Sequence, residues 1–65
     1  MKIVVNGAWL ETCATDLNGA LSELGFVDSV VATALNGEFV PKIARPGVRL
    51  TEGDCLEVLA PMQGG

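Results

Sequence analysis

The chain has 65 residues, of which 49% are apolar and 18% charged, and its formal net charge is −4. This length allows one small domain with a single core and excludes a chain of several domains. The apolar fraction and the low charged fraction exclude an intrinsically disordered chain. Eight acidic residues against four basic ones argue against nucleic acid as a partner.

Membrane association is not expected either. Apolar runs such as Val30–Ala32 are far shorter than the about 20 residues that span a bilayer. The N-terminal segment reaches Asn6 and Gly7 too early to hold the apolar core of a signal peptide. We therefore expect a cytoplasmic location and no contact with a membrane.

The two cysteines, Cys13 and Cys55, form no Cys-x-x-Cys pair, and the chain has no histidine. This composition argues against a zinc or redox centre, so no metal site is predicted. Three interpretations remain: two buried thiols that act as small apolar residues, a disulfide in a secreted chain, or one exposed reactive thiol. For a cytoplasmic chain we favour two buried thiols.

The first predicted element is a β-hairpin. Met1–Val5 is apolar and rich in β-branched residues, which is typical of a strand. Asn6-Gly7 is a strong signal for a two-residue turn, because both positions of that turn need positive φ. Ala8–Cys13 is then predicted to return antiparallel to the first strand.

A short helix is predicted next. Thr15 or Asp16 can cap its first turn with a side-chain oxygen, and Gly25 can end it in a left-handed conformation. Its apolar residues recur at helical spacing and form one face: Leu17, Ala20, Leu21 and Leu24.

The second half of the chain is predicted to contain three more strands. In chain order the segments are a strand at Val30–Leu35, a turn at Asn36-Gly37, a strand at Glu38–Val40, a loop or irregular turn over Lys42–Thr51, a turn at Glu52–Asp54 and a strand at Cys55–Leu59. Pro41 ends the fourth strand, because proline cannot donate to the ladder of a sheet.

This order of elements predicts an α+β domain with the β-grasp, or ubiquitin-like, fold. We expect a four- to five-stranded mixed sheet with one main helix packed on one face. The first and last strands can pair in parallel at the centre of the sheet, because the helix supplies a crossover between them. Residues 1–60 are predicted to form the domain and residues 61–65 a flexible C-terminal tail.

No arrangement of catalytic residues is evident. The chain has no histidine, no tyrosine and no glycine-rich phosphate loop between a strand and a helix. Glu52, Asp54 and Glu57 could in principle act as acid and base, but carboxylates around a polar turn are normally solvated. We therefore expect that the chain is not an enzyme and binds no cofactor of its own.

Three of the four basic residues, Lys42, Arg45 and Arg49, fall in the predicted loop. They could bind a phosphate or an acidic partner. They could equally keep an exposed loop in solution. The sequence leaves both interpretations open.

The last five residues, Pro61 to Gly65, suggest chemistry of a different kind. Gly64 and Gly65 carry no side chain, so the backbone that leads to a carboxylate at Gly65 would be narrow enough to enter a channel. A carboxylate is a poor electrophile and needs activation by another protein, for example as an acyl-adenylate, before sulfur can convert it to a thiocarboxylate. A terminal Gly-Gly can also be an unstructured end. Its position after the last strand of a β-grasp domain favours the chemical interpretation.

Three segments and the overall length resemble the ThiS family, the sulfur carriers of bacterial thiamin thiazole synthesis. The segments are the opening MKIVVNG, the second turn LNGEFVPK and the ending EGDCLEVLAPMQGG. The resemblance runs over the whole chain. It implies a sulfur carrier protein whose C-terminal carboxylate is adenylated and converted to a thiocarboxylate.

The resemblance also implies roles for the tail and a set of partners. Gly65 would carry the activated carboxylate, Gly64 would pass through the partner's channel, and Gln63 and Met62 would line the tail. A ThiF-type adenylating enzyme would use ATP and Mg²⁺, a cysteine desulfurase or sulfurtransferase would supply sulfur, and a ThiG-type thiazole synthase would receive it. The chain alone is expected to be a monomer.

A partner-binding patch is predicted from strand alternation. The positions of the first and last strands that face the helix are apolar: Ile3, Val5, Leu56 and Val58. Val4 and Leu59 then project from the other face of the sheet, where exposed apolar side chains suggest a docking site that Met62 would extend. Scattered apolar residues on a surface can also be without function.

Three other functions remain as alternatives. A MoaD-like carrier for molybdopterin synthesis would share the fold and the tail, although the first strand and the second turn match it less well. A non-covalent β-grasp binding or regulatory module would not use its chain end. A conjugated ubiquitin-like protein would form isopeptide bonds to lysine.

Overall fold

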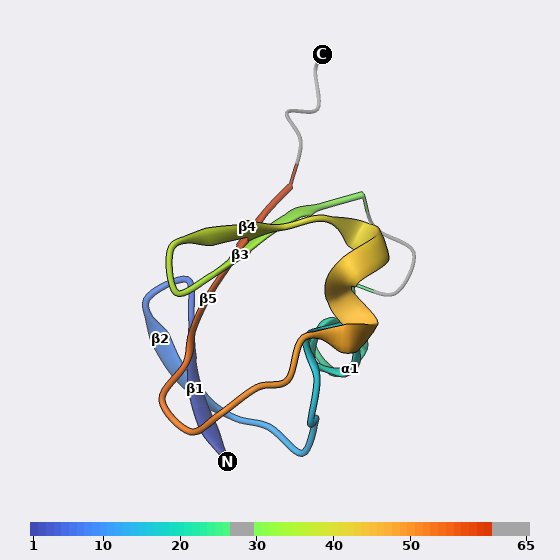
Figure 1. The fold of residues 1–65 in the computed structure, drawn as a ribbon. Coiled ribbons are helices and arrows are strands. Elements are labelled where there is room, and N and C mark those ends of the chain that lie inside the picture. Colours follow the sequence, from blue (N-terminus) through green and yellow to red (C-terminus); the bar gives the residue numbers. More distant parts are fainter. Residues whose placement is uncertain (27–29, 61–65) are drawn as a thin grey trace.

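The computed structural model describes residues 1–26 and 30–60 (Figure 1). Its elements in chain order are β1 (Lys2–Val5), β2 (Ala8–Glu11), α1 (Leu17–Glu23), β3 (Ala32–Leu35), β4 (Glu38–Val40), the 3₁₀ helix η1 (Lys42–Gly47) and β5 (Cys55–Leu59). The strands form one five-stranded mixed sheet, with the helices packed against one side of it (Figure 1). The predicted α+β fold of the β-grasp type is confirmed.

The strand order of the sheet is β2-β1-β5-β3-β4. β1 and β5 are parallel, while the pairs β1/β2, β3/β4 and β3/β5 are antiparallel. The expected parallel pairing of the first and last strands is therefore present. The last strand is the central strand of the sheet, with one hairpin on each side.

The two Asn-Gly turns have the predicted backbone geometry. Asn6 and Gly7 have φ of 50° and 87°, and Asn36 and Gly37 have φ of 52° and 86°. Positive φ at both central residues defines the type I′ turn, whose twist matches that of the strands it joins.

Helix α1 begins and ends at the predicted residues. Asp16 is the N-cap, and its side chain accepts a 2.7 Å hydrogen bond from the backbone N–H of Gly19. Gly25 has φ of 93°, so it ends the helix in the left-handed region. The glycine at position 19 also has a packing reason, since a Cβ there would lie 3.3 Å from Oδ1 of Asp16.

The core lies between the sheet and the two helices. Its buried apolar residues come from β1, α1, β4, β5 and the segment after η1: Ile3, Val5, Leu17, Ala20, Leu21, Val40, Leu50, Leu56 and Val58. The expected helix face is confirmed, with Leu24 partly buried against the same cluster. The first and last strands supply four of these residues, so the parallel pair forms the sheet side of the core.

Three strands are shorter than predicted. β1 begins at Lys2 rather than Met1, β2 ends at Glu11 rather than Cys13, and β3 begins at Ala32 rather than Val30. After β2, Thr12 still bonds the first strand through its N–H to Met1 C=O (2.8 Å), and its side chain is buried and bonded to the C-terminal end of α1. Its hydroxyl also accepts a 3.0 Å hydrogen bond from the N–H of Ala14, which turns the chain away from the sheet.

The segment Lys42–Thr51, predicted as a loop or irregular turn, contains the 3₁₀ helix η1, which the prediction did not include. Pro46 argues against an α-helix in the sequence, but the shorter i→i+3 bonds of a 3₁₀ helix tolerate it near the end. The following segment is fixed to the start of α1, because Leu17 N–H bonds Val48 C=O (2.9 Å) and Leu50 N–H bonds Thr15 C=O (3.0 Å).

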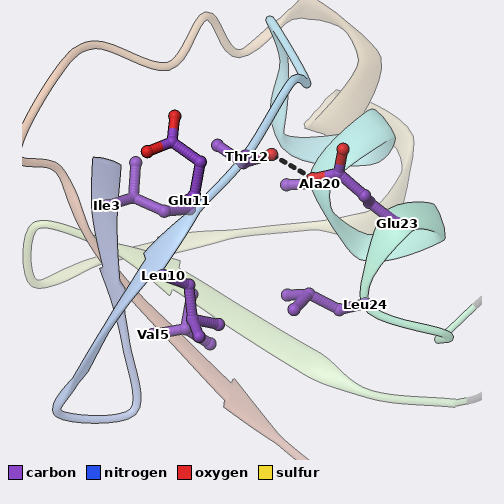
Figure 2. Close-up of a pocket in the computed structure, with 8 residues that line it drawn as sticks. All are labelled: Ile3, Val5, Leu10, Glu11, Thr12, Ala20, Glu23 and Leu24. Carbon is purple, nitrogen blue, oxygen red and sulfur yellow. Dashed lines mark hydrogen bonds between the residues drawn. The ribbon is translucent and has the colours of Figure 1, made fainter. Parts of the chain in front are cut away.

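The end of β2 is joined to the end of α1 by Glu23. Its carboxylate accepts hydrogen bonds from the hydroxyl of Thr12 and, at 3.1 Å, from the backbone N–H of Cys13. Figure 2 shows this connection beside a cavity between β1, β2 and α1. The cavity has a volume of about 10 Å³. That is close to the space of one water molecule, so it is a packing gap rather than a ligand site.

The Thr12–Glu23 connection predicts how stability depends on pH. The Thr12 hydroxyl, followed by the Cys13 N–H, holds the pKa of Glu23 below its ordinary value. The stabilisation is therefore complete above the unfolded-state pKa of about 4.3 and is lost as the pH falls below it, through the folded-state pKa. Glu23→Gln should lower the free energy of unfolding at pH 7 and make its decline on acidification shallower.

Urea unfolding between pH 7 and pH 3 measures both effects. Thr12→Val removes the hydroxyl but keeps the side-chain shape, so it should also flatten the acid limb. Wild-type pH dependence in both variants would contradict a stabilising role for this connection.

Candidate functional site

The candidate site begins at β5, the strand that leads to the chain's last residues. Its neighbour β1 is held by backbone bonds from Val4 N–H to Asp54 C=O (2.8 Å) and from Asn6 N–H to Leu56 C=O (3.0 Å). The predicted tail residues lie outside the described residues: Met62, Gln63, Gly64 and Gly65. The structure therefore fixes the strand that precedes the tail and not the tail itself.

Two asparagine side chains hold β5, one near each end. The side-chain amide of Asn6 accepts a bond from Val58 N–H (2.9 Å) and donates one to Val58 C=O (3.1 Å). The side-chain oxygen of Asn36 accepts from Cys55 N–H (2.9 Å). In the sequence both asparagines indicate only turns, because these bonds depend on a strand far along the chain.

We call the side of the sheet turned away from the helices the outer face. The alternation of β5 and the strand register place ten residues on it: Lys2, Val4, Trp9, Glu11, Ala32, Ala34, Phe39, Cys55, Glu57 and Leu59. Among the large side chains Trp9 is 64% exposed, Phe39 70% and Leu59 67%. The outer face is thus mainly apolar and open, with an aromatic residue on each edge strand and the charged pair Lys2–Glu11 at one end of the β1–β2 hairpin.

The two predicted docking residues both belong to this outer face. Val4 is half-buried at its centre, between Trp9 and Cys55. Leu59 is exposed at the end of β5 that is nearer the tail. The prediction places both on the correct face but omits the aromatic residues of the edge strands, which strand alternation in β2 and β4 could have indicated.

An open apolar depression of about 290 Å³ lies beside Leu59 at this end of the sheet. The described residues that line it have apolar side chains: Val30, Val31, Ala32, Leu59 and Ala60. Small-molecule sites usually combine an apolar lining with a few polar groups that orient the ligand. This depression has the character of a place where a partner's apolar side chain could rest.

The basic segment does not form one site. Arg45 is buried, and its guanidinium donates to the hydroxyl of Thr33 (3.1 Å) and to the carbonyl of Val31 (2.6 Å). Lys42 and Arg49 are exposed. Arg45 is therefore a structural residue that joins η1 to β3, and only the other two cations are free to meet an acidic partner.

The acidic turn before β5 is structural as well. Burial alone would raise the pKa of Asp54, but hydrogen bonds from Thr51 and the Asn36 amide outweigh it and hold that pKa below its ordinary value. An ionised carboxylate with these partners orders the turn and is unsuited to donate a proton. The side chain of Glu52 accepts a 3.1 Å bond from Lys2 N–H at the start of β1.

Both cysteines are exposed thiols, so the favoured prediction of two buried thiols is wrong. Cys55 projects from the outer face because Leu56 and Val58, on alternate positions of the same strand, face the core. Cys13 follows the end of β2, where Thr12 takes the buried position. They are free and form no disulfide with each other.

Residues 1–26 and 30–60 contain neither a metal-binding cluster nor a membrane-spanning helix. No three side chains among histidine, cysteine, aspartate and glutamate come close enough together to bind a metal ion there. Within the same residues, no helix has the length and apolar character needed to cross a bilayer.

Comparison with known proteins decides the family. A sequence model of the ThiS family matches residues 3–65. The chain belongs to the ThiS family. The resemblance seen in the sequence is confirmed, and the match includes the glycine pair that the described structure leaves out.

Solved ThiS structures have the same fold. The crystal structure of the thiamine biosynthesis protein ThiS from Geobacter metallireducens superimposes with a TM-score of 0.84 at 29% identity, over all of both chains. A solution structure of a thiamine biosynthesis protein from the same organism gives a TM-score of 0.80 at 29% identity, over all of this chain and 88% of the other.

A longer relative is also similar to this ThiS-family chain. A thiazole synthase of Paramagnetospirillum magneticum is 38% identical over 66 residues. The alignment covers all of this chain and 20% of the relative, so the chain spans about a fifth of that protein's length.

The exposure of both thiols predicts their reactivity. A disulfide reagent that releases a coloured thiolate should titrate Cys13 and Cys55 in the folded protein, since neither needs unfolding to become accessible. Cys13→Ser and Cys55→Ser should each remove one equivalent, and circular dichroism should show that the fold is retained. Titration of either thiol only after denaturant is added would contradict the structure.

Proposed function

We propose that this ThiS-family chain is a sulfur carrier of thiamin biosynthesis whose reactive group is the carboxylate of Gly65. The observation that carries the proposal is the continuity of the chain. The central strand β5 of a ThiS-type β-grasp domain ends one residue, Ala60, before the sequence Pro61-Met62-Gln63-Gly64-Gly65, and the family match extends to Gly65. The folded body then serves to hold and present this end.

The proposed chemistry converts the carboxylate in three steps. A ThiF-type partner uses ATP and Mg²⁺ to join AMP to the carboxylate, and pyrophosphate leaves. A persulfide on a cysteine desulfurase or sulfurtransferase then attacks the acyl carbon, and AMP leaves. A thiol finally cleaves the acyl disulfide that has formed: the thiol sulfur bonds the donor's sulfur, a disulfide is left, and the acyl group keeps the other sulfur as a thiocarboxylate. The resulting thiocarboxylate supplies sulfur for thiazole formation. The chain contributes the acyl group and its presentation, while ATP and Mg²⁺ belong to the partner.

The composition of the tail suits such chemistry. The five residues from Pro61 to Gly65 can extend about 15 Å from the end of the domain, at ~3.3 Å per residue. The absence of side chains at Gly64 and Gly65 gives this reach the smallest possible cross-section. Gly64 would pass through the partner's channel, with Gln63 and Met62 lining the tail.

A ThiG-type thiazole synthase is the proposed acceptor of the sulfur. The relative from Paramagnetospirillum magneticum supports this choice, because a segment similar to this chain makes up about a fifth of a protein named thiazole synthase. Joining two proteins that must meet in one polypeptide raises their effective concentration. The carrier and the thiazole synthase would meet either as separate chains or as two parts of one polypeptide.

The outer face is the proposed docking surface. It combines exposed apolar side chains with a carboxylate on its central strand, Glu57, which lies on β5 next to Ala34 and is exposed. Interfaces of this kind take their affinity from a few apolar anchors and their selectivity from charge complementarity. An apolar partner surface with a cation opposite Glu57 would match both features, and Leu59 is the anchor nearest the tail.

The modification itself is the first test. Protein purified from cells that make thiamin should contain a species heavier by the difference between one sulfur and one oxygen atom, and a reagent selective for thioacids should remove it. Deletion of Gly65 should abolish this species and the ATP–pyrophosphate exchange catalysed with the partner.

The variant Lys42→Ala, at an exposed position on η1, should still form the heavier species and support ATP–pyrophosphate exchange. Thiocarboxylate that forms on the shortened chain, or a modified form linked to lysine through an isopeptide bond, would contradict the carrier function. Sulfur accepted by a molybdopterin synthase and refused by thiazole synthase would assign the carrier to the other pathway.

The docking surface is tested by charge insertion. Leu59→Lys places a cation among apolar side chains that a partner must bury, so the affinity for thiazole synthase should fall at least tenfold, which is about 1.4 kcal/mol. Ile43→Lys is the matched control, because Ile43 is 91% exposed on η1 and away from the outer face. Titration calorimetry measures both affinities. Equal affinities for the two variants would exclude docking through the outer face near Leu59.

A further inference from the structure

The parallel pairing between β1 and β5 stops before β5 ends. The register runs from Val4 opposite Cys55 to Val5 opposite Leu56, after which the chain enters the Asn6-Gly7 turn. Backbone groups of alternate strand residues point to opposite neighbours. The carbonyl of Leu56 points towards β1, where Asn6 N–H bonds it, and the backbone groups of Val58 point the same way. Val58 therefore faces a position that β1 no longer occupies.

The side chain of Asn6 fills that position. Its oxygen accepts from Val58 N–H at 2.9 Å and its nitrogen donates to Val58 C=O at 3.1 Å. A side-chain amide carries one acceptor and donors in the same arrangement as a peptide group. Asn6 thus extends the ladder of β1 by one more pair, after the backbone has turned away.

We infer that Asn6 is a positioning residue for the reactive end of the chain. This inference rests on the proposed function, in which the chain beyond β5 carries the acyl group. Val58 is the last residue of β5 held from the β1 side, and only Leu59 and Ala60 separate it from the tail. By bonding both backbone groups of Val58, Asn6 fixes the position and direction of the end of β5, two residues before Pro61.

The second turn supplies a matched control. Asn36 has nearly the same φ as Asn6, also precedes a glycine, and also accepts a 2.9 Å bond from a β5 amide. That amide belongs to Cys55, at the start of β5 and therefore at the end away from the tail. Loss of either side chain should weaken the sheet, but only loss of Asn6 should release the tail end.

The experiment compares Asn6→Gly with Asn36→Gly. Glycine adopts positive φ without steric cost, so both type I′ turns are retained while the side-chain bonds are removed. Adenylation and sulfur transfer are measured with the full-length chain and its two partner enzymes. Asn6→Gly should lower kcat about tenfold, because a poorly placed acyl group seldom reaches attack geometry, with KM unchanged since the outer face is intact. Asn36→Gly should keep the wild-type kcat.

Amide hydrogen exchange gives a second readout. Exchange at Val58 should accelerate in Asn6→Gly and stay slow in Asn36→Gly. Equal kcat values for the two glycine variants, or a change in Asn6→Gly confined to KM, would overturn the positioning role. A wild-type chain that forms no thiocarboxylate would instead refute the proposed function, so the two failures are distinguishable.

Asn6→Asp is the second variant, in case Asn6→Gly does not fold. The aspartate keeps an oxygen for Val58 N–H but replaces the donor to Val58 C=O with a second oxygen. Its kcat should therefore lie between that of Asn36→Gly and the tenfold loss expected for complete removal. A wild-type kcat for Asn6→Asp would overturn the inference.

Discussion

The position of β5 between β1 and β3 is the constraint on which the rest of the structure depends. A parallel pair such as β1 and β5 needs a crossover, and α1 provides it by packing over the side of the sheet where Leu56 and Val58 are buried. The two hairpins then occupy the flanks, each closed by an Asn-Gly turn. The strand that precedes the C-terminal segment is consequently the central strand of the sheet.

Alternation along β5 connects the core to the outer face within five residues. Leu56 and Val58 are buried under the helices, while Cys55, Glu57 and Leu59 are exposed on the other side. Packing that stabilises the fold therefore also fixes the surface proposed for docking. A partner that binds the outer face holds the body within a few residues of the tail, which shortens the distance over which the acyl group must be guided.

Local patterns predicted most of the fold, and the errors arose where tertiary contacts decide. Strand alternation, the Asn-Gly turns and the Asp16 cap depend on neighbouring residues, so the sequence carries them. The 3₁₀ helix η1 and the burial of Arg45 depend on Thr33 and the carbonyl of Val31, which no local pattern identifies. The exposure of Cys55 could be predicted from the sequence, because the alternation that buries Leu56 places Cys55 on the opposite face. The general tendency of cysteines to be buried pointed to the wrong result.

The carboxylate of Glu57 opposes self-association of the chain through the open outer face. A symmetric dimer through the outer face would bring the same patch of both copies together. In such a dimer with its axis near Glu57, the carboxylate would be buried against apolar groups or its counterpart, in a chain whose net charge is already −4. Both arrangements cost free energy, through desolvation or like-charge repulsion. A partner that places a cation opposite Glu57 avoids both costs, so the same carboxylate disfavours a second copy and favours a complementary enzyme surface.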